Sequence, residues 1–162
     1  MYDGSIARFE RVRFMDGAFT VGITPEKKIL ITRQEQPARS SSFVSLPGGA
    51  FDTPDEDPLE CAKRELLEET GYMSDEWELW FTAEGTNNVI AYTYFYIAHE
   101  CKKVADISAD AGEKIELDEI SFDEFLLLSE EPHLVHWPHL PYLFGARLQS
   151  DTYEVLKKKL RM

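Results

Sequence analysis

Cysteine is scarce in this chain, and long apolar runs are missing from its sequence. The 162 residues include two cysteines, Cys61 and Cys101, whose separation fits neither a metal-ligand spacing nor a disulfide framework. No apolar stretch of about 18 residues occurs, and no basic start followed by an apolar run opens the sequence. These features argue against a disulfide-rich secreted protein and against a membrane protein. We therefore expect a protein of the reducing cytoplasm without a membrane partner.

Positive charge is also in deficit. Lysine and arginine number 17 against 30 aspartates and glutamates, which gives a net charge of −13 at pH 7. Such a surface repels nucleic-acid backbones, so we expect no nucleic-acid partner and favour a small substrate whose charge a bound metal offsets. Hydrophobic residues make up 43% of the chain, which is enough to build a core. The length predicts one domain over residues 1–162.

An acidic cluster stands out in the segment RELLEETGY, Arg64 through Tyr72. Glu65, Glu68 and Glu69 are spaced by three and four residues, so on a helix they share one face. Like charges at these spacings repel by a few tenths of a kcal/mol per pair. A cation between the carboxylates removes that cost, and hard oxygen ligands suit Mg²⁺ or Mn²⁺. The alternative is an ordinary solvated acidic face.

Local signals place this cluster on a helix of residues 58–70. Asp57 is a good N-cap, and Pro58 suits the first helical position. Gly71 stands where a left-handed C-terminal cap is needed. An apolar stripe at helical spacing predicts the buried side, and it consists of Leu59, Ala62 and Leu66. The inner face of the helix should therefore lie in the core and its acidic face beside a loop.

The segment resembles the second half of the Nudix box, the signature of the Nudix hydrolases. Glu56 is separated from Arg64 by the seven residues that the box requires. Six residues separate Gly49 from Glu56 where the family usually has five, so the loop between them is one residue longer. Asp55 consequently competes with Glu56 for the outer carboxylate position.

The resemblance implies an α/β fold, the Nudix α/β/α sandwich with a mixed central sheet. It also implies a metal-dependent hydrolase with Mg²⁺ or Mn²⁺ as cofactor and a small-molecule nucleotide as substrate. The implied metal ligands are Glu65, Glu68, Glu69 and a carbonyl near Gly49. Arg64 would orient these glutamates, which makes Arg64 and Glu68 part of the catalytic set. The alternative for Arg64 is a surface ion pair with Glu60.

A general base is expected in a late loop, as in relatives that resemble ADP-ribose pyrophosphatases. The segment AGEKIELDEISFDE resembles that loop, and Glu113 is its best match. Glu116 is the second candidate. The alternative is that both are solvated loop carboxylates.

Substrate contacts are expected from the segment ITRQEQPAR, which resembles the family's Arg-Gln motif at a strand end. Arg33 and Arg39 are candidates for phosphate contacts because guanidinium binds phosphate oxygens in a bidentate manner. The family's second arginine, three residues after the first, is Gln36 here. Glu56 completes the expected substrate-binding set, and surface arginines are the alternative for Arg33 and Arg39.

The implied reaction is cleavage of a nucleoside diphosphate derivative, with ADP-ribose or a related nucleoside diphosphate sugar as the leading substrate. The turn Ala83-Glu84-Gly85 lacks the proline that many ADP-ribose hydrolases carry there. Two alternatives stay open: a nucleoside triphosphate pyrophosphohydrolase, and a nucleotide-sensing Nudix domain without turnover. The intact box glutamates favour an enzyme over the sensing domain.

The remaining pattern predicts alternating strands and helices. Expected strands are 7–14, 18–23, 28–32, 43–46, 77–83, 89–98 and 115–120. A capping box at Ser121 predicts a second helix, and a helical C-terminal segment is expected over about 130–162. His133, His136 and His139 recur every three residues, but Pro138 argues against a metal-binding helix. We interpret that segment as a packing surface or a homodimer surface.

Overall fold

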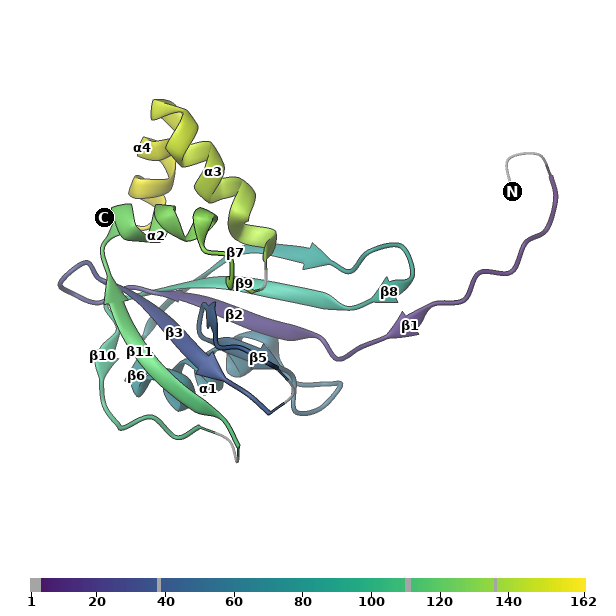
Figure 1. Ribbon diagram of the computed structural model, residues 1–162, viewed down its shortest axis with the longest axis horizontal. Helices are drawn as coiled ribbons and strands as arrows, with labels where there is room; N and C mark the ends of the chain where they lie inside the picture. The colour runs from purple at the N-terminus through teal and green to yellow at the C-terminus, as the bar shows by residue number, and fades with distance from the viewer. Residues whose placement is uncertain (1–3, 38, 110–111, 136) are drawn as a thin grey trace.

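The computed structural model describes residues 4–37, 39–109, 112–135 and 137–162, and it forms a three-layered α/β/α sandwich (Figure 1). One helix, α1 (Pro58–Thr70), lies below the sheets in this view. The other face carries α2 (Phe122–Leu127), α3 (Leu140–Leu148) and α4 (Ser150–Lys159). The fold class expected from the sequence is confirmed.

Two sheets form the middle layer. The four-stranded sheet has the order β5-β2-β9-β7 and is mixed, because β2 and β9 run parallel while the other neighbours are antiparallel. Its strands are β5 (Gly48–Ala50), β2 (Gly17–Gly22), β9 (Tyr92–His99) and β7 (Glu76–Glu84). The antiparallel sheet has the order β11-β3-β4. Its strands are β11 (Lys114–Ile120), β3 (Ile29–Glu35) and β4 (Phe43–Ser45).

Side chains that alternate along the strands supply two different cores. Phe19 and Val21 of β2 join the large cluster beneath α2, α3 and α4, whereas Ala18 packs with Cys61 and Ala62 of α1. Because successive residues of a strand point to opposite faces, one strand serves both cores. Helix α1 is thereby packed against the four-stranded sheet, close to the strands that contribute to the site.

The predicted boundaries of α1 are confirmed. The Asp57 carboxylate accepts hydrogen bonds from the backbone N–H groups of Leu59 and Glu60. Gly71 ends the helix in the left-handed region at φ 74°, where its N–H bonds the carbonyl of Leu67. A side chain at Gly71 would also collide with the backbone of residue 105, so glycine is required there.

Two strand predictions need correction. Of the expected strand 7–14, only β1 (Val12–Arg13) pairs, in parallel with β8 (Val89–Ile90), and the residues before it run along an arm away from the body (Figure 1). The expected strand 89–98 is divided at Ala91. The chain changes partners there, from β1 before the break to β2 and β7 after it. A periodic pattern does not reveal such a change of partner.

Shorter elements complete the chain. They are β6 (Tyr72–Met73), which pairs with β10 (Lys102–Lys103), and the 3₁₀ helices η1 (Leu128–Glu130) and η2 (Trp137–His139). The helical C-terminal segment packs on the sheet through fully buried side chains such as Leu143 and Leu160. None of the helices in the described ranges has the length and apolar character needed to span a bilayer.

The three histidines do not share one environment. His139 is fully buried with its ring 5.8 Å from that of Phe95, whereas His133 is exposed. His136 lies outside the described residues. Packing therefore accounts for His139, in agreement with the interpretation of this segment as a packing surface.

Candidate active site

A cavity of about 490 Å³ opens on the α1 side of the sheets. It brings together seven of the nine residues that the sequence nominated, namely Arg39, Gly49, Arg64, Glu65, Glu68, Glu69 and Glu113. The two nominated residues outside its lining are Arg33 and Glu56. Residues from the loop after β3, from β5, from α1 and from the segment before β11 therefore meet at one place.

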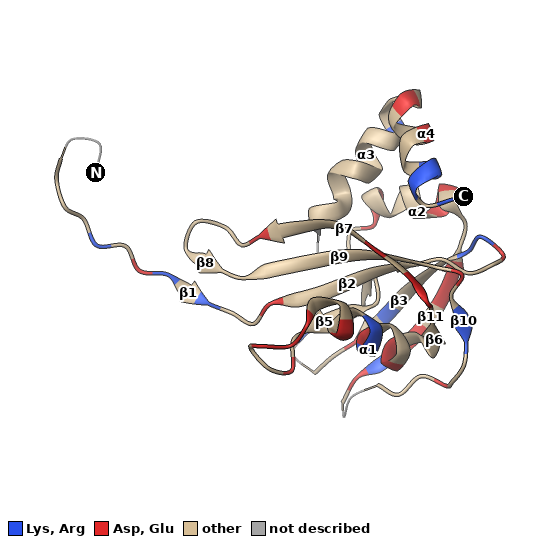
Figure 2. Ribbon diagram, turned by 180° about the vertical axis from the view of Figure 1, so that it is seen from behind, with Lys and Arg blue, Asp and Glu red and all other residues tan. Residues whose placement is uncertain are grey.

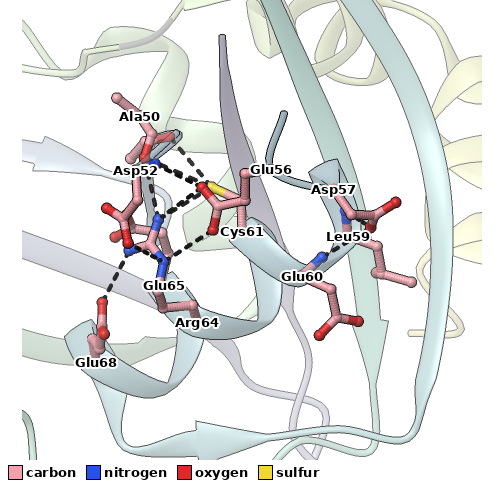
Figure 3. Close-up of polar contacts among 11 residues, drawn as sticks. Ala50, Asp52, Glu56, Asp57, Leu59, Glu60, Cys61, Arg64, Glu65 and Glu68 are labelled. Atoms are coloured by element: carbon pink, nitrogen blue, oxygen red, sulfur yellow. Dashed lines mark hydrogen bonds and ion pairs between the residues drawn. The ribbon is translucent and has the colours of Figure 1, made fainter. Parts of the chain in front are cut away.

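Arg64 is the hub of the acidic cluster (Figure 3). Its Nη1 lies 2.8 Å from Glu65 Oε1 and 3.1 Å from Glu68 Oε2, and its Nε lies 3.2 Å from Glu56 Oε1. Its Nη2 also donates to the carbonyl of Ala50 at 3.2 Å. The planar guanidinium thus holds the carboxylates of Glu56, Glu65 and Glu68 in place relative to strand β5. These contacts are compatible with the orienting role expected for Arg64.

The alternative partner of Arg64 is wrong. Glu60 lies on another side of α1 and forms its ion pair with Lys63 at 2.8 Å. Glu60 therefore belongs to the solvated surface of the helix, and Arg64 belongs to the site.

The longer loop leaves Glu56 able to reach Arg64. The Glu56 carboxylate accepts a hydrogen bond from the backbone N–H of Asp52 at 2.7 Å, which closes the loop, and it is 15% exposed. Asp55 is exposed. Glu56 thus occupies the outer carboxylate position, where it contacts Arg64 and does not line the cavity.

Glu69 is the most deeply buried of the cluster carboxylates. Its Oε1 accepts a hydrogen bond from Gln34 Nε2 at 2.5 Å, and its Oε2 accepts one from the Gly48 N–H at 2.8 Å. Burial raises the pKa of Glu69 to about 8 despite these donors, and the nearby charge of Glu65 adds to the rise. Burial likewise raises the pKa of Glu65 to about 6, against the lowering effect of Arg64. Burial therefore opposes the ionised form of both carboxylates.

The donor chemistry of this face fits a hard divalent cation. Figure 2 shows acidic residues along α1 and along the loop that precedes it. Gly49 approaches the cluster so closely that an added Cβ would lie 2.5 Å from Glu65 Oε1, so a side chain at this position would displace the Glu65 carboxylate. No three His, Cys, Asp or Glu side chains within the described ranges already converge as a metal site. A cation would thus compete with Arg64 for Glu65 and Glu68.

Of the two candidate bases, only Glu113 lines the cavity. Its Oε1 accepts a hydrogen bond from Gln36 Nε2 at 2.7 Å. Glu116 instead pairs with Lys114 at 3.2 Å, in a separate surface depression. Sequence reasoning missed Gln36 as a partner of Glu113, although its place in the Arg-Gln motif was a usable signal.

The two candidate phosphate-binding arginines differ in position. Arg39 lines the cavity, and its guanidinium lies 4.3 Å from the centre of the Phe43 ring. Arg33 pairs with Asp118 of β11 at 2.6 Å and lines a different depression. Arg33 alternates along β3 with Gln34, so the two side chains point to opposite faces. The structure therefore brings Arg39 to the site and leaves Arg33 outside it.

Comparison with known protein families assigns this chain to a family. The NUDIX domain family matches residues 13–142. The chain belongs to the Nudix hydrolases. This assignment makes the protein a pyrophosphohydrolase that acts on small-molecule nucleotides, in a family whose members generally use divalent metal ions.

Two curated relatives are similar over most of the chain. The methanol dehydrogenase activator of Bacillus methanolicus is 30% identical over 135 residues, which cover 82% of this chain and 72% of that protein. The ADP-ribose pyrophosphatase of Bacillus subtilis (strain 168) is 26% identical over 132 residues, covering 79% and 70%. The second relative supports the ADP-ribose pyrophosphatase-like branch of the family.

Solved structures share the fold. One described as an ADP compounds hydrolase superposes with a TM-score of 0.70 at 20% identity, covering 91% of this chain and 75% of its own. A NUDIX hydrolase from Nitrosomonas europaea has a TM-score of 0.63 at 18% identity, covering 88% and 90%. At these identities the likeness establishes the architecture.

Proposed function

We propose that this Nudix enzyme hydrolyses the diphosphate of ADP-ribose, or of a related nucleoside diphosphate sugar, with Mg²⁺ or Mn²⁺. The observation that carries the proposal is one cavity in which the α1 glutamates face Glu113. The B. subtilis relative named as an ADP-ribose pyrophosphatase supports the choice of substrate.

In this proposal, some residues of the cavity bind the metal ion and another accepts a proton. Glu65, Glu68 and Glu69 would hold the metal, and the Gly49 carbonyl is a further candidate ligand. When bound, a divalent ion neutralises the diphosphate and lowers the pKa of a water molecule. Arg64 keeps Glu65 and Glu68 directed into the cavity.

Glu113 is the group that accepts the proton of the attacking water. The water oxygen bonds to one phosphorus while the bond from that phosphorus to the bridging oxygen breaks. ADP-ribose and water thereby give AMP and ribose 5-phosphate. Arg39 would contact a phosphate oxygen, and the support for this role is that it lines the cavity beside Phe43.

A substrate panel tests this proposal. ADP-ribose, UDP-glucose, GDP-mannose and dATP are incubated with enzyme in Mg²⁺ and in EDTA, and the products are separated by chromatography. We expect AMP and ribose 5-phosphate from ADP-ribose, in Mg²⁺ only, with little conversion of dATP. Preference for dATP would establish the triphosphate pyrophosphohydrolase alternative, and nucleotide binding without any product would establish the sensing alternative.

The setting we propose is cytoplasmic, with residues 1–162 forming one domain. Two free thiols, Cys61 and Cys101, and their buried positions suit a reducing compartment. The C-terminal segment packs within the chain through residues such as Leu143, while Phe144 and Leu148 stay exposed. Light scattering tests whether that exposed part also forms a homodimer.

A further inference from the structure

Two glutamine side chains on one face of the β3 segment join the two sides of the cavity. Gln36 Nε2 donates to Glu113 Oε1 at 2.7 Å and to Gln34 Oε1 at 3.3 Å. Gln34 Nε2 donates to Glu69 Oε1 at 2.5 Å and to Thr32 Oγ1 at 3.0 Å. A continuous line of hydrogen bonds thus connects the candidate base with the buried carboxylate of α1.

The contacts of Gln36 fix how the two amides are turned. Its NH₂ group donates to both Glu113 and the Gln34 oxygen, so the Gln34 oxygen faces Gln36 and the Gln34 NH₂ group faces Glu69. Each NH₂ group has two hydrogens, and each makes two bonds. Gln34 is 3% exposed and Thr32 is fully buried. Breaking a hydrogen bond at Gln34 or Thr32 would leave a buried polar group unpaired, which is costly, so this end of the network is held in place.

We propose that Gln36 is a positioning residue that holds Glu113 at the cavity, and that Gln34 couples Gln36 to Glu69. The proposal rests on the proposed role of Glu113 as general base. Within the described residues, Glu113 accepts a hydrogen bond through Oε1 alone, so Oε2 is left for the proton of the attacking water. A neutral amide at position 36 holds the carboxylate without pairing it to a cation.

A double-mutant cycle in the steady-state kinetics tests this coupling. Gln36→Leu should lower kcat about ten-fold and change KM by less than about two-fold, because the loss concerns the reacting geometry. The same change made in a Glu113→Gln background should have no further effect. The matched control is Glu35→Gln, since Glu35 is exposed on the opposite face of the same strand and pairs with Lys114. That control should keep the wild-type rate.

The outcomes separate this inference from the proposed function. An equal loss of kcat in both backgrounds, or no loss in either, would overturn the role of Gln36 while leaving Glu113 as base. A Glu113→Gln enzyme with the wild-type rate would overturn the base assignment itself. If the panel favours another nucleotide, the cycle is run with that substrate, because the network does not depend on the sugar.

A second readout needs neither metal nor substrate. The chain has three glutamines, Gln34, Gln36 and the exposed Gln149, so selective ¹⁵N labelling of glutamine side chains gives three NH₂ signals. We expect slow hydrogen exchange at Gln34 and Gln36 and fast exchange at Gln149. Glu113→Ala should speed exchange at Gln36 and leave Gln34 slow. Equal exchange rates at all three side chains would contradict the network.

Discussion

The two faces of strand β3 differ: one packs in the apolar core, and the other contributes polar side chains to the candidate site. Ile29 and Ile31 point into the apolar cluster beneath α2, α3 and α4, where they are almost completely buried. Thr32 and Gln34 are equally buried, yet on the α1 side they form hydrogen bonds that lead to the carboxylates of the cavity. Side chains of similar burial therefore form an apolar core on one face of the strand and part of a polar site on the other face. Substitutions on the two faces should separate stability from turnover.

The largest effect is expected on the α1 face. Glu68→Gln removes one anionic ligand from a side chain that is 43% exposed, so the fold should keep its melting temperature. Turnover should fall by at least about 1,000-fold, because the metal supplies several kcal/mol of transition-state stabilisation. Rates at saturating Mg²⁺ and thermal melts measure both quantities.

Glu69→Gln is the companion variant. It should also abolish turnover, and it should cost some stability because its new NH₂ group would face the N–H donors of Gln34 or Gly48. Wild-type rates in both variants would refute the proposed metal role of this helix.

The next effect concerns the opposite wall of the cavity. Glu113→Gln should lower kcat by about 100-fold to 10,000-fold, which is the usual contribution of a positioned proton acceptor. KM should change little, because the loss is confined to the transition state. Near-normal turnover would indicate a reaction without a separate carboxylate base, because Glu116 lies outside the cavity.

The packing face should show the reverse behaviour. Leu143→Ala removes a fully buried side chain beneath the C-terminal helices and should lower the free energy of unfolding by about 2–5 kcal/mol. The rate per folded molecule should stay at the wild-type value, because Leu143 does not line the cavity. A loss of kcat in folded protein would show that the two faces are coupled.

The smallest effect is a pH dependence on the packing face. Burial lowers the pKa of His99, and Arg161 adds to this while Glu78 and Glu76 oppose it. Below about pH 6.5 His99 is protonated in the unfolded chain but not in the folded chain. The free energy of unfolding therefore decreases as the pH falls through that range. His99→Gln should flatten this part of the profile in urea titrations between pH 7.5 and 5.5. A profile unchanged by the substitution would exclude His99 as its source.

Local features of the fold were predictable from the sequence. Asp57 and Gly71 cap α1 as expected, because capping depends on residues within one helical turn. The buried stripe of α1 follows from periodicity alone, and Ala62 and Leu66 are indeed completely buried. The same locality put the three box glutamates in one cavity.

Features that depend on distant pairing were not predictable. Gln36 and Glu113 are 77 residues apart, and their contact depends on the register of β3 with β11. The same register lets Arg33 pair with Asp118, 85 residues away, so Arg33 does not reach the expected site. A pattern in one strand gives no information about the residue opposite it.

Isothermal titration calorimetry with Mg²⁺ is the most direct test of the account. It compares the wild-type protein with Glu68→Gln and with the matched control Glu60→Gln, whose carboxylate lies on the same helix but pairs with Lys63. We predict that Glu68→Gln weakens the Kd at least about ten-fold, as loss of a metal ligand should, and that Glu60→Gln leaves it unchanged. The same Mg²⁺ affinity in all three proteins, or no Mg²⁺ binding by the wild type, would contradict the claim that the α1 face holds the catalytic metal.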